Sequence, residues 1–396
     1  MVHTRPDLIT VDTRSEPVTA TPRVVLMDAG PWLPVPPPAY GGLENVVSTL
    51  VTELQARGVR VVVAASEGST QACEELLVTG EPAFGLLGRP YTEVVGRVHD
   101  HVQQVAGYLR AHPEVELVHT HTEVVGPSLL AQVDGGPPVL HTLHWDPSRQ
   151  AGFYDGFDGR GRVFVNAVSA NHERCMPERV RRLSVGAVHL ATPPAPELPD
   201  PPPGAPVVVL GRVHPTKGQD AAALACLDAD RPLVLAGPVG PYTTPAALEA
   251  ALADGTATHA DVAYWRDVVA PLLDGGARRW VGVVGGADKA ALLAGASALL
   301  MPVRWEEPGA TVVVEALAAG TPVIGMARGA LPELVEHGVT GFLADHESEL
   351  PAYVSKLDQL DRAACRRAWA ERFTPAHMAD GYLAAYAEVL RRAAAA

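Results

Sequence analysis

Hydrophobic residues follow two alternating patterns along this chain. Short runs rich in Val, Leu and Ala, such as residues 23–28 and 59–64, are typical of buried strands. Between these two runs, apolar residues recur every three or four positions, which predicts an amphipathic helix that opens at Gly41 and Gly42 and ends at Gly58. Because the alternation continues along almost the whole chain, we predict an α/β fold with doubly wound parallel sheets.

A proline-rich segment, residues 193–203, interrupts this alternation near the middle of the chain. Such a segment cannot contribute to a core and is typical of a linker between domains. The expected parts are a disordered leader (1–21), an N-terminal domain (22–195), a linker (196–205), a C-terminal domain (206–372) and a final helix (373–396). Further strands are expected at residues 117–120, 138–144, 163–169, 206–210, 232–236, 280–284, 298–301 and 322–325.

Composition supports two globular domains and excludes several kinds of partner. With 396 residues, of which 47% are hydrophobic and 19% charged, the chain has enough apolar material for two cores. A net charge of −14 without a block of Lys or Arg argues against nucleic acid or an anionic membrane as partner. No apolar run is long enough for a membrane segment, and four cysteines without a C-x-x-C pair indicate reduced thiols, so we expect a cytoplasmic protein.

The most informative feature is a pair of carboxylates, Glu307 and Glu315, around the predicted start of a helix. A rise of about 1.5 Å per residue would place them up to roughly 12 Å apart, with the free N–H groups of the first helical turn between them. This arrangement fits a ligand that carries hydroxyls at both ends and an anion in the middle. A nucleotide diphosphate sugar has that layout.

Two loops offer groups that could meet such an anion. Gly41 and Gly42 follow a proline-rich entry after the first strand, where backbone N–H groups could approach a phosphate, although a simple tight turn explains the glycines equally well. The strand at residues 206–210 ends in Gly211, and Arg212 and Lys217 follow it, so that two cations lie where a diphosphate could bind. Lys217 is one of only three lysines in the chain, which favours a functional role over a solvated turn.

Histidines cluster at the ends of two predicted strands. His119 and His121 share one face of a strand and could chelate a metal, but no third ligand is apparent, so a structural role is favoured and no metal site is predicted. His144 leads into a loop at the carboxyl edge of the sheet, where sites assemble, and we expect it to touch substrate. No G-x-G-x-x-G, Walker or G-x-S-x-G motif occurs, which argues against dehydrogenase, NTPase and esterase functions.

Taken in order, these motifs resemble the family-four retaining glycosyltransferases of the GT-B type, across roughly residues 22 to 392. The segments that carry the resemblance are PPPAYGGLENVVSTLVTELQARG, VLHTLH, AVSANHERC, GRVHPTKG, WEEPGATVVVEALAAGTPVIG and ELVEHGVTGFLAD. The resemblance implies two Rossmann-like domains that face a cleft, with the final helix crossing back to the N-terminal domain. It also implies a donor such as a UDP- or GDP-sugar, no required cofactor or metal, and a small polar acceptor.

The resemblance also implies roles for individual residues. Glu315 would accept hydrogen bonds from the ribose, Glu307 would meet the donor sugar, Arg212 and Lys217 would hold the diphosphate, and His144 would lie near the reacting sugar. Backbone groups would complete the donor site; they belong to Gly41, Gly42, Gly211, Gly285, Gly309, Ala310, Thr311 and Val312. Variable loops at residues 67–91 and 145–160 would form the acceptor pocket.

One departure from the family pattern leaves other functions open. The family has a Pro-Phe-Gly-Leu step after the first glutamate, whereas this chain has Pro308, Gly309, Ala310 and Thr311. The loss of the aromatic residue changes the loop around the donor sugar. A nucleotide-sugar 2-epimerase on the same fold and a non-catalytic nucleotide-sugar binder are therefore the alternatives to a hexosyltransferase.

Overall fold

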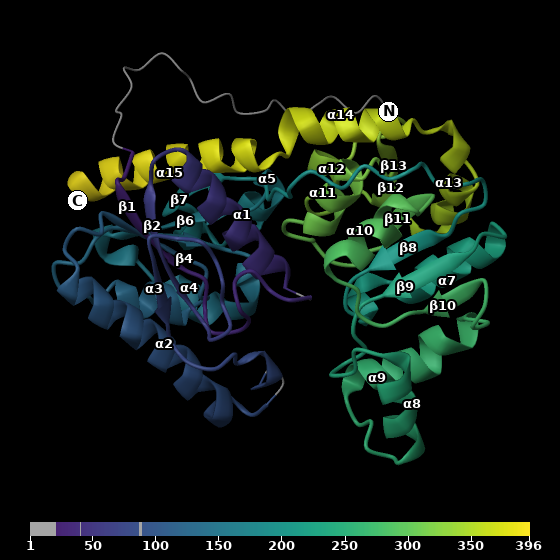
Figure 1. The fold of residues 1–396 in the computed structure, drawn as a ribbon, viewed down its shortest axis with the longest axis horizontal. Helices are drawn as coiled ribbons and strands as arrows, with labels where there is room; N and C mark the ends of the chain where they lie inside the picture. The colour runs from purple at the N-terminus through teal and green to yellow at the C-terminus, as the bar shows by residue number, and fades with distance from the viewer. Residues whose placement is uncertain (1–20, 40, 87–88) are drawn as a thin grey trace.

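The protein folds into two lobes, each built on one parallel β-sheet (Figure 1). The structure is a computed structural model, and it describes residues 21–39, 41–86 and 89–396. The predicted leader lies outside the described residues except for residue 21, and Tyr40, beside the glycine pair, lies outside them too. The predicted fold class, two Rossmann-like parallel-sheet units, is confirmed.

The N-terminal lobe contains a seven-stranded sheet in the order β3-β2-β1-β4-β5-β6-β7. Its strands are β1 (Val24–Asp28), β2 (Arg60–Ala65), β3 (Glu75–Val78), β4 (Leu117–Thr120), β5 (Val139–Thr142), β6 (Val163–Ala167) and β7 (Ser184–Ala187). Its helices are α1 (Gly42–Ala56), α2 (Tyr91–Ala111), α3 (Val125–Leu130), α4 (Ala151–Gly156), α5 (Ala170–Cys175) and α6 (Glu178–Arg181).

Both faces of this sheet are covered by helices, which explains why its strands appear in the sequence as continuous apolar runs. Alternate residues of a strand point to opposite faces. In β1, Val25 and Met27 belong to the core that α1 helps to form, whereas Val24 and Leu26 belong to a separate core on the α2 side.

The C-terminal lobe contains a six-stranded sheet in the order β10-β9-β8-β11-β12-β13. Its strands are β8 (Val207–Leu210), β9 (Leu233–Ala236), β10 (Arg278–Trp280), β11 (Ala298–Met301), β12 (Val323–Met326) and β13 (Gly341–Ala344). The helices of this half of the chain are α7 (Gln219–Asp228), α8 (Pro245–Ala253), α9 (Ala260–Tyr264), α10 (Gly286–Ala294), α11 (Thr311–Ala318), α12 (Leu331–Leu334), α13 (Leu350–Val354), α14 (Arg362–Arg372) and α15 (Pro375–Ala394).

The last helix, α15, leaves the C-terminal lobe and lies along the N-terminal one (Figure 1). It begins after Thr374, whose side chain accepts a hydrogen bond from the N–H of His377 and so caps the helix. Tyr382 and Tyr386 are fully buried in the N-terminal core, and the Tyr386 hydroxyl lies 2.8 Å from Nδ1 of His119. The predicted return of the final helix to the N-terminal lobe is therefore confirmed.

The strand predicted at residues 280–284 was placed too late. The observed strand, β10, ends at Trp280, and Gly282 then takes a φ of 80° while the N–H of Val283 donates to the carbonyl of Thr243. The chain therefore leaves the sheet just where the apolar residues continue. Residues 196–205 form no helix or strand between the lobes, and the domain limits given above stay predictions.

Candidate active site

Loops at the carboxyl edges of the two sheets meet between the lobes. The Ser169 hydroxyl, after β6, donates a 2.7 Å hydrogen bond to the carbonyl of Pro308, after β11. Gly285, before α10, packs so closely on the loop before α1 that a Cβ atom added to it would lie 2.6 Å from Cα of Ala39. Ligands of doubly wound sheets bind at this edge. The residues predicted for the donor site thus come from loops that converge here.

Lys217 and Glu307, predicted from separate motifs, form an ion pair with 2.6 Å between Nζ and Oε2. The indole N–H of Trp305 donates to the same oxygen at 2.9 Å, and Nζ lies 5.1 Å from the centroid of that ring. Within the part of the chain that the structure describes, no group donates to Oε1 of Glu307. This oxygen can accept a hydrogen bond from a ligand hydroxyl.

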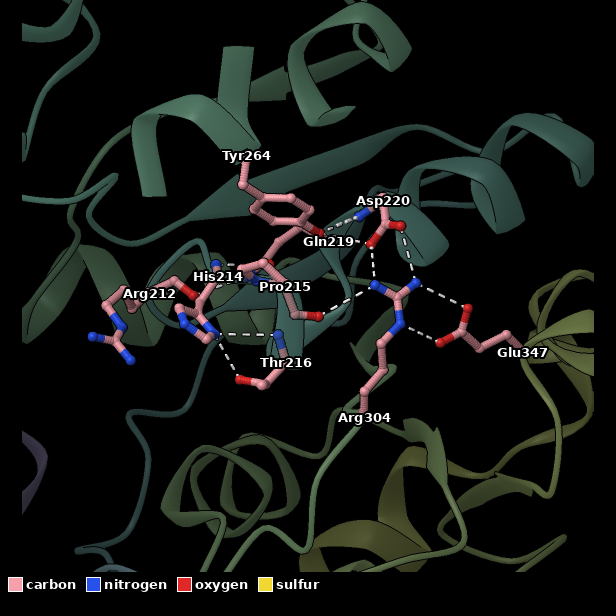
Figure 2. A network of polar contacts seen from close by, with 9 residues as sticks. All are labelled: Arg212, His214, Pro215, Thr216, Gln219, Asp220, Tyr264, Arg304 and Glu347. Carbon is pink, nitrogen blue, oxygen red and sulfur yellow. Dashed lines mark hydrogen bonds and ion pairs between the residues drawn. The ribbon is translucent and has the colours of Figure 1, made fainter. Parts of the chain in front are cut away.

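The loop that carries Lys217 is built by a histidine cap and a left-handed glycine (Figure 2). Nδ1 of His214 accepts a hydrogen bond from the N–H of Thr216, which starts the 3₁₀ turn Pro215–Lys217. Gly218 then takes a φ of 70°, and a Cβ atom there would lie 2.2 Å from the carbonyl oxygen of Pro302. Only glycine fits this position, so the turn is held close to the end of β11.

Arg304 joins this loop to the loop that carries Glu307 (Figure 2). Its guanidinium pairs with both oxygens of Asp220, each at 2.9 Å, and with both oxygens of Glu347, at 2.6 and 3.0 Å. It also donates to the carbonyl of Pro215 at 3.2 Å, and its backbone N–H donates to the carbonyl of Thr216. Planar bidentate contacts of this kind fix position as well as charge.

Arg212 takes no part in this network. Figure 2 shows its side chain extending away from the His214 turn, and the side chain is exposed. The backbone carbonyl of Arg212 accepts a hydrogen bond from Gln219, but its guanidinium has no hydrogen bond or ion pair with any described residue. A free guanidinium at the carboxyl end of β8 can bind a phosphate.

Helix α11 follows the loop that carries Glu307 and supplies Glu315. It begins at Thr311, and the N–H groups of Thr311 and Val312 donate to no other described residue, as expected for a first helical turn. Oε1 of Glu315 lies 2.6 Å from Nζ of Lys289, on α10. The two predicted glutamates are therefore each paired with a lysine.

The unusual step after Glu307 is explained by contact between the lobes. A Cβ atom on Gly309 would lie 2.9 Å from Cδ1 of Leu190 and 3.0 Å from Cγ2 of Val168, both in the N-terminal lobe. There is no space for an aromatic side chain in this arrangement. Ala310, which follows, has a φ of 45°, a left-handed conformation that alanine rarely adopts.

His144 lies at the end of β5, on the N-terminal side of the site, and is partly exposed. Its Nε2 is 2.8 Å from Nδ1 of His121, a fully enclosed ring that also contacts the sulfur of Met27. Burial lowers the pKa of His144 to about 3, and the nearby His141 adds to the effect. His144 is therefore neutral at physiological pH and can act through hydrogen bonds but not through charge.

His119 and His121 belong to the core. His119 is hydrogen-bonded to Thr142 and to Tyr386, which confirms the structural role favoured for this pair. Among the described residues, no three His, Cys, Asp or Glu side chains lie together in a way that could hold a metal ion. Nor does any described helix combine the length and the apolar character needed to cross a lipid bilayer.

The glycine pair that opens α1 differs in its two members. A Cβ atom on Gly41, whose φ is 155°, would lie 2.6 Å from Cβ of Pro37, whereas one on Gly42 would meet nothing within 4 Å. Gly41 is therefore required by the turn, and Gly42 leaves open space at the helix start. Glu44, in the first turn of α1, is buried, and burial raises its pKa to about 7.

Two parallel-sheet lobes and a final helix that crosses from one lobe to the other are the architecture of the GT-B class of glycosyltransferases. Residues 201–368 match the model of the glycosyl transferases group 1, and residues 40–175 match that of glycosyltransferase family 4. The chain belongs to this glycosyltransferase family.

Known relatives agree with this assignment. The D-inositol 3-phosphate glycosyltransferase of Mycolicibacterium smegmatis is 28% identical over 325 residues, which cover 72% of this chain and 71% of that protein. The protein of the same name from Jonesia denitrificans is 31% identical over 279 residues, 65% of this chain and 56% of that protein.

Solved structures share the fold. AviGT4, a glycosyltransferase involved in avilamycin A biosynthesis, superposes with a TM-score of 0.66 at 23% identity, covering 93% of this chain and 98% of AviGT4. HepE of Anabaena, in complex with UDP and glucose, superposes with a TM-score of 0.63 at 19% identity, covering 91% of this chain and 98% of HepE.

Several residues of the site were not predicted from the sequence. Lys289 was noted only as a scarce residue, and its pairing with Glu315 depends on how α10 packs beside α11. Arg304 and Glu306 lie beside the predicted Glu307, but nothing in the local sequence shows which loops they reach. Glu333, in the C-terminal lobe, accepts hydrogen bonds from the N–H groups of Ala170 and Asn171 at the start of α5, a contact that no local motif announces.

Proposed function

We propose that this protein transfers a hexosyl group from a nucleotide diphosphate sugar, such as a UDP- or GDP-sugar, to a hydroxyl of a small polar acceptor. The anomeric configuration would be retained, and no metal would be required. The observation that supports this proposal is the ion pair of Lys217 with Glu307 just before α11, together with the unpaired guanidinium of Arg212 in the loop after β8.

In this proposal, the charges of the cleft match the parts of the donor. The ribose hydroxyls bind Glu315, the diphosphate binds Arg212 and Lys217, and the sugar hydroxyls bind the open oxygen of Glu307. An ammonium group has three donors, so Lys217 can keep its bond to Glu307 while it donates to a phosphate oxygen. The bond between the anomeric carbon and the phosphate oxygen breaks, the acceptor oxygen bonds to that carbon on the same face, and the proton of the acceptor hydroxyl passes to the departing diphosphate. The cations and the helix N–H groups stabilise the departing charge.

His144 has a positioning function in this scheme. A neutral imidazole beside the reacting sugar can donate or accept a hydrogen bond without adding positive charge near an electron-poor anomeric carbon. Its bond to His121 fixes the ring, so one nitrogen remains to meet the substrate. UDP with glucose is bound by HepE, which makes UDP-glucose the first donor to test here.

The test is release of the nucleoside diphosphate from a panel of UDP- and GDP-sugars with a panel of polyol acceptors. We expect turnover by the wild type and a loss of about 100-fold or more in kcat/KM for Lys217→Met, as for removal of one preorganised charge contact. Lys356→Met is the matched control, because Lys356 lies over the ring of Tyr353, away from the cleft. Equal activities of the two variants would refute the role of Lys217.

The same assays separate the two alternatives. A 2-epimerase would change the donor without an acceptor, which NMR of the sugar product detects. A non-catalytic binder would show heat of binding in calorimetry with a nucleotide sugar but no turnover across the acceptor panel. Inversion at the anomeric carbon of the product would contradict the retaining mechanism.

A further inference from the structure

A small cavity of about 220 Å³ lies between the lobes, next to the residues of the proposed donor site. Glu306, which immediately precedes Glu307, lines it from the C-terminal lobe, and the loop after β5 and helix α5 line it from the N-terminal lobe. The N-terminal residues are Asp146, Ser148, Asn171, His172 and Cys175. Asp146 lies two residues beyond His144, so the cavity adjoins both parts of the proposed site.

The wall of the cavity is held by hydrogen bonds that leave one oxygen of each carboxylate open. The Asn171 amide donates to Oε2 of Glu306 at 3.0 Å, and the N–H of Gly329 donates to the same atom at 2.7 Å. Oδ1 of Asp146 accepts from the N–H of Ser148 at 2.9 Å. Among the described residues, no donor reaches Oε1 of Glu306 or Oδ2 of Asp146.

His172, which also lines the cavity, carries a buried nitrogen without a partner among the described residues. Its side chain is only 3% exposed, and its Nε2 lies 2.9 Å from the carbonyl oxygen of Trp145. Because a carbonyl can only accept, Nε2 carries the proton and Nδ1 is an acceptor. Nδ1 has no hydrogen-bond partner, and such orphaned buried groups are rare. Burial lowers the pKa of His172, which keeps the ring neutral and Nδ1 unprotonated.

Two of the open polar atoms of this cavity are negatively charged carboxylate oxygens, which can only accept, and the Ser148 hydroxyl can donate or accept. No Lys or Arg lines the cavity. Arg174, outside the lining, is exposed and donates to Oδ1 of Asn171. A ligand that meets the two carboxylate oxygens must bring donors, and an ammonium group is favoured because charge-assisted hydrogen bonds are stronger than neutral ones.

We propose that this cavity binds the acceptor substrate, and that the acceptor presents hydroxyls and an amino group to Asp146 and Glu306. An acceptor with a phosphate or carboxylate at this position is excluded by like charge. This inference rests on the proposed function, since it assumes that a sugar is transferred across the neighbouring cleft. The acceptor proposed here also differs in charge from the inositol 3-phosphate in the names of two relatives, which is anionic.

A matched set of three ring compounds tests the inference: glucosamine, glucose and glucose 6-phosphate. Binding to the full-length protein with the nucleoside diphosphate present is measured by saturation-transfer NMR and calorimetry. We expect glucosamine to bind more tightly than glucose, and glucose 6-phosphate to bind on the order of 100-fold more weakly than glucosamine, because like charges cost several kcal/mol at close range. Tighter binding of glucose 6-phosphate, or no binding of any of the three at millimolar concentration, would overturn the inference.

Isosteric variants show whether the two carboxylates cause the ranking. Asp146→Asn and Glu306→Gln keep the shape of the cavity and remove one charge each, so each is expected to reduce the preference for glucosamine over glucose 6-phosphate about tenfold. Asp228→Asn is the control, because Asp228 is an exposed carboxylate at the end of α7, in the C-terminal lobe, without a partner among the described residues. Thermal melting checks that all three variants fold. An unchanged preference in folded Asp146→Asn and Glu306→Gln would refute the inference.

Donor binding, measured separately with UDP- and GDP-sugars, distinguishes a failure of the cavity inference from a failure of the proposed function. If the donor binds and is turned over but the three compounds do not follow the expected order, the cavity inference fails and the proposed function stands. If no nucleotide sugar binds, the proposed function fails, whatever the ring compounds do.

Discussion

Replacing Arg304 by methionine tests whether the two loops of the proposed donor site are held in place by one side chain. The variant keeps an unbranched side chain and removes every contact of the guanidinium with Asp220, Glu347 and the carbonyl of Pro215. The pKa of the Asp220 carboxyl is low because the bonds from Arg304 and Tyr264 outweigh the effect of burial, which would raise it. Without Arg304, this carboxylate keeps its charge and loses its main partner.

The expected loss of stability follows from the exposure of the three side chains. Breaking a fully buried ion pair costs about 3–5 kcal/mol, and breaking an exposed one costs about 0–1 kcal/mol. The side chains of Arg304, Asp220 and Glu347 are 33%, 18% and 38% exposed, so the solvent screens them in part. We therefore expect Arg304→Met to lower the free energy of unfolding by about 2 kcal/mol.

The variant should also weaken donor binding, because the turn that carries Lys217 loses its anchor. A displacement of about 1 Å in a site costs up to roughly 100-fold, so we expect KM for the nucleotide sugar to rise by about tenfold or more. Urea denaturation and steady-state kinetics give the two numbers. Arg266→Met is the control, since Arg266 forms an exposed pair with its neighbour Asp267. Equal denaturation midpoints and equal KM values for the two variants would refute the positioning role of Arg304.

Three further predictions concern backbone strain, buried charge and lobe contact. Ala310→Gly should raise the free energy of unfolding by about 0.5–1 kcal/mol. The left-handed conformation is unfavourable for alanine, and this strain outweighs the extra conformational entropy that a glycine loses on folding. A lower melting temperature of the variant would contradict this prediction. Burial lowers the pKa of His141 to about 4, so the folded protein favours the neutral ring. Because a histidine in the unfolded chain has a pKa of about 6.5, the free energy of unfolding falls as the pH drops below about 6.5. In urea titrations, the difference in free energy of unfolding between the wild type and His141→Asn should therefore narrow by about 2 kcal/mol between pH 6.5 and 5. A constant difference would argue against the low pKa of His141. Gly285→Ala should push Ala39 away and reduce kcat/KM roughly tenfold without lowering the melting temperature, and unchanged kinetics would refute the contact.

The sequence predicted the fold because the signals that define it are local. Each strand of a doubly wound sheet is buried on both faces, so it appears as a short apolar run, and β4 and β11 were placed with correct ends. The edge strand β3 was not predicted, and its residues were assigned to a loop. They are half exposed and do not form a buried apolar run. The strand before Gly282 was misplaced because apolar residues continue after the chain has turned away.

The site was predictable in part for a similar reason. Lys217 and Glu307 were singled out by motif and scarcity, and the structure places them in contact. The partners of Glu315 and of Arg304 could not be predicted, because they lie on separate elements that meet only through the packing of helices on the sheet. The same holds for the cavity at Asp146 and Glu306, whose walls come from both lobes.

One of the contacts between the lobes, made by Glu333, lies beside the cavity and the proposed donor site. The carboxylate of Glu333, in the C-terminal lobe, accepts hydrogen bonds from the first N–H groups of α5, at 2.9 and 2.6 Å, and from Nε2 of His189. A carboxylate at a helix N-terminus is stabilised by the helix dipole as well as by these bonds. The same helix supplies Asn171, which bonds Glu306 beside the donor-site residue Glu307. The contact between Glu333 and α5 therefore holds the two walls of the cavity that we propose for the acceptor next to the donor-site residue Glu307.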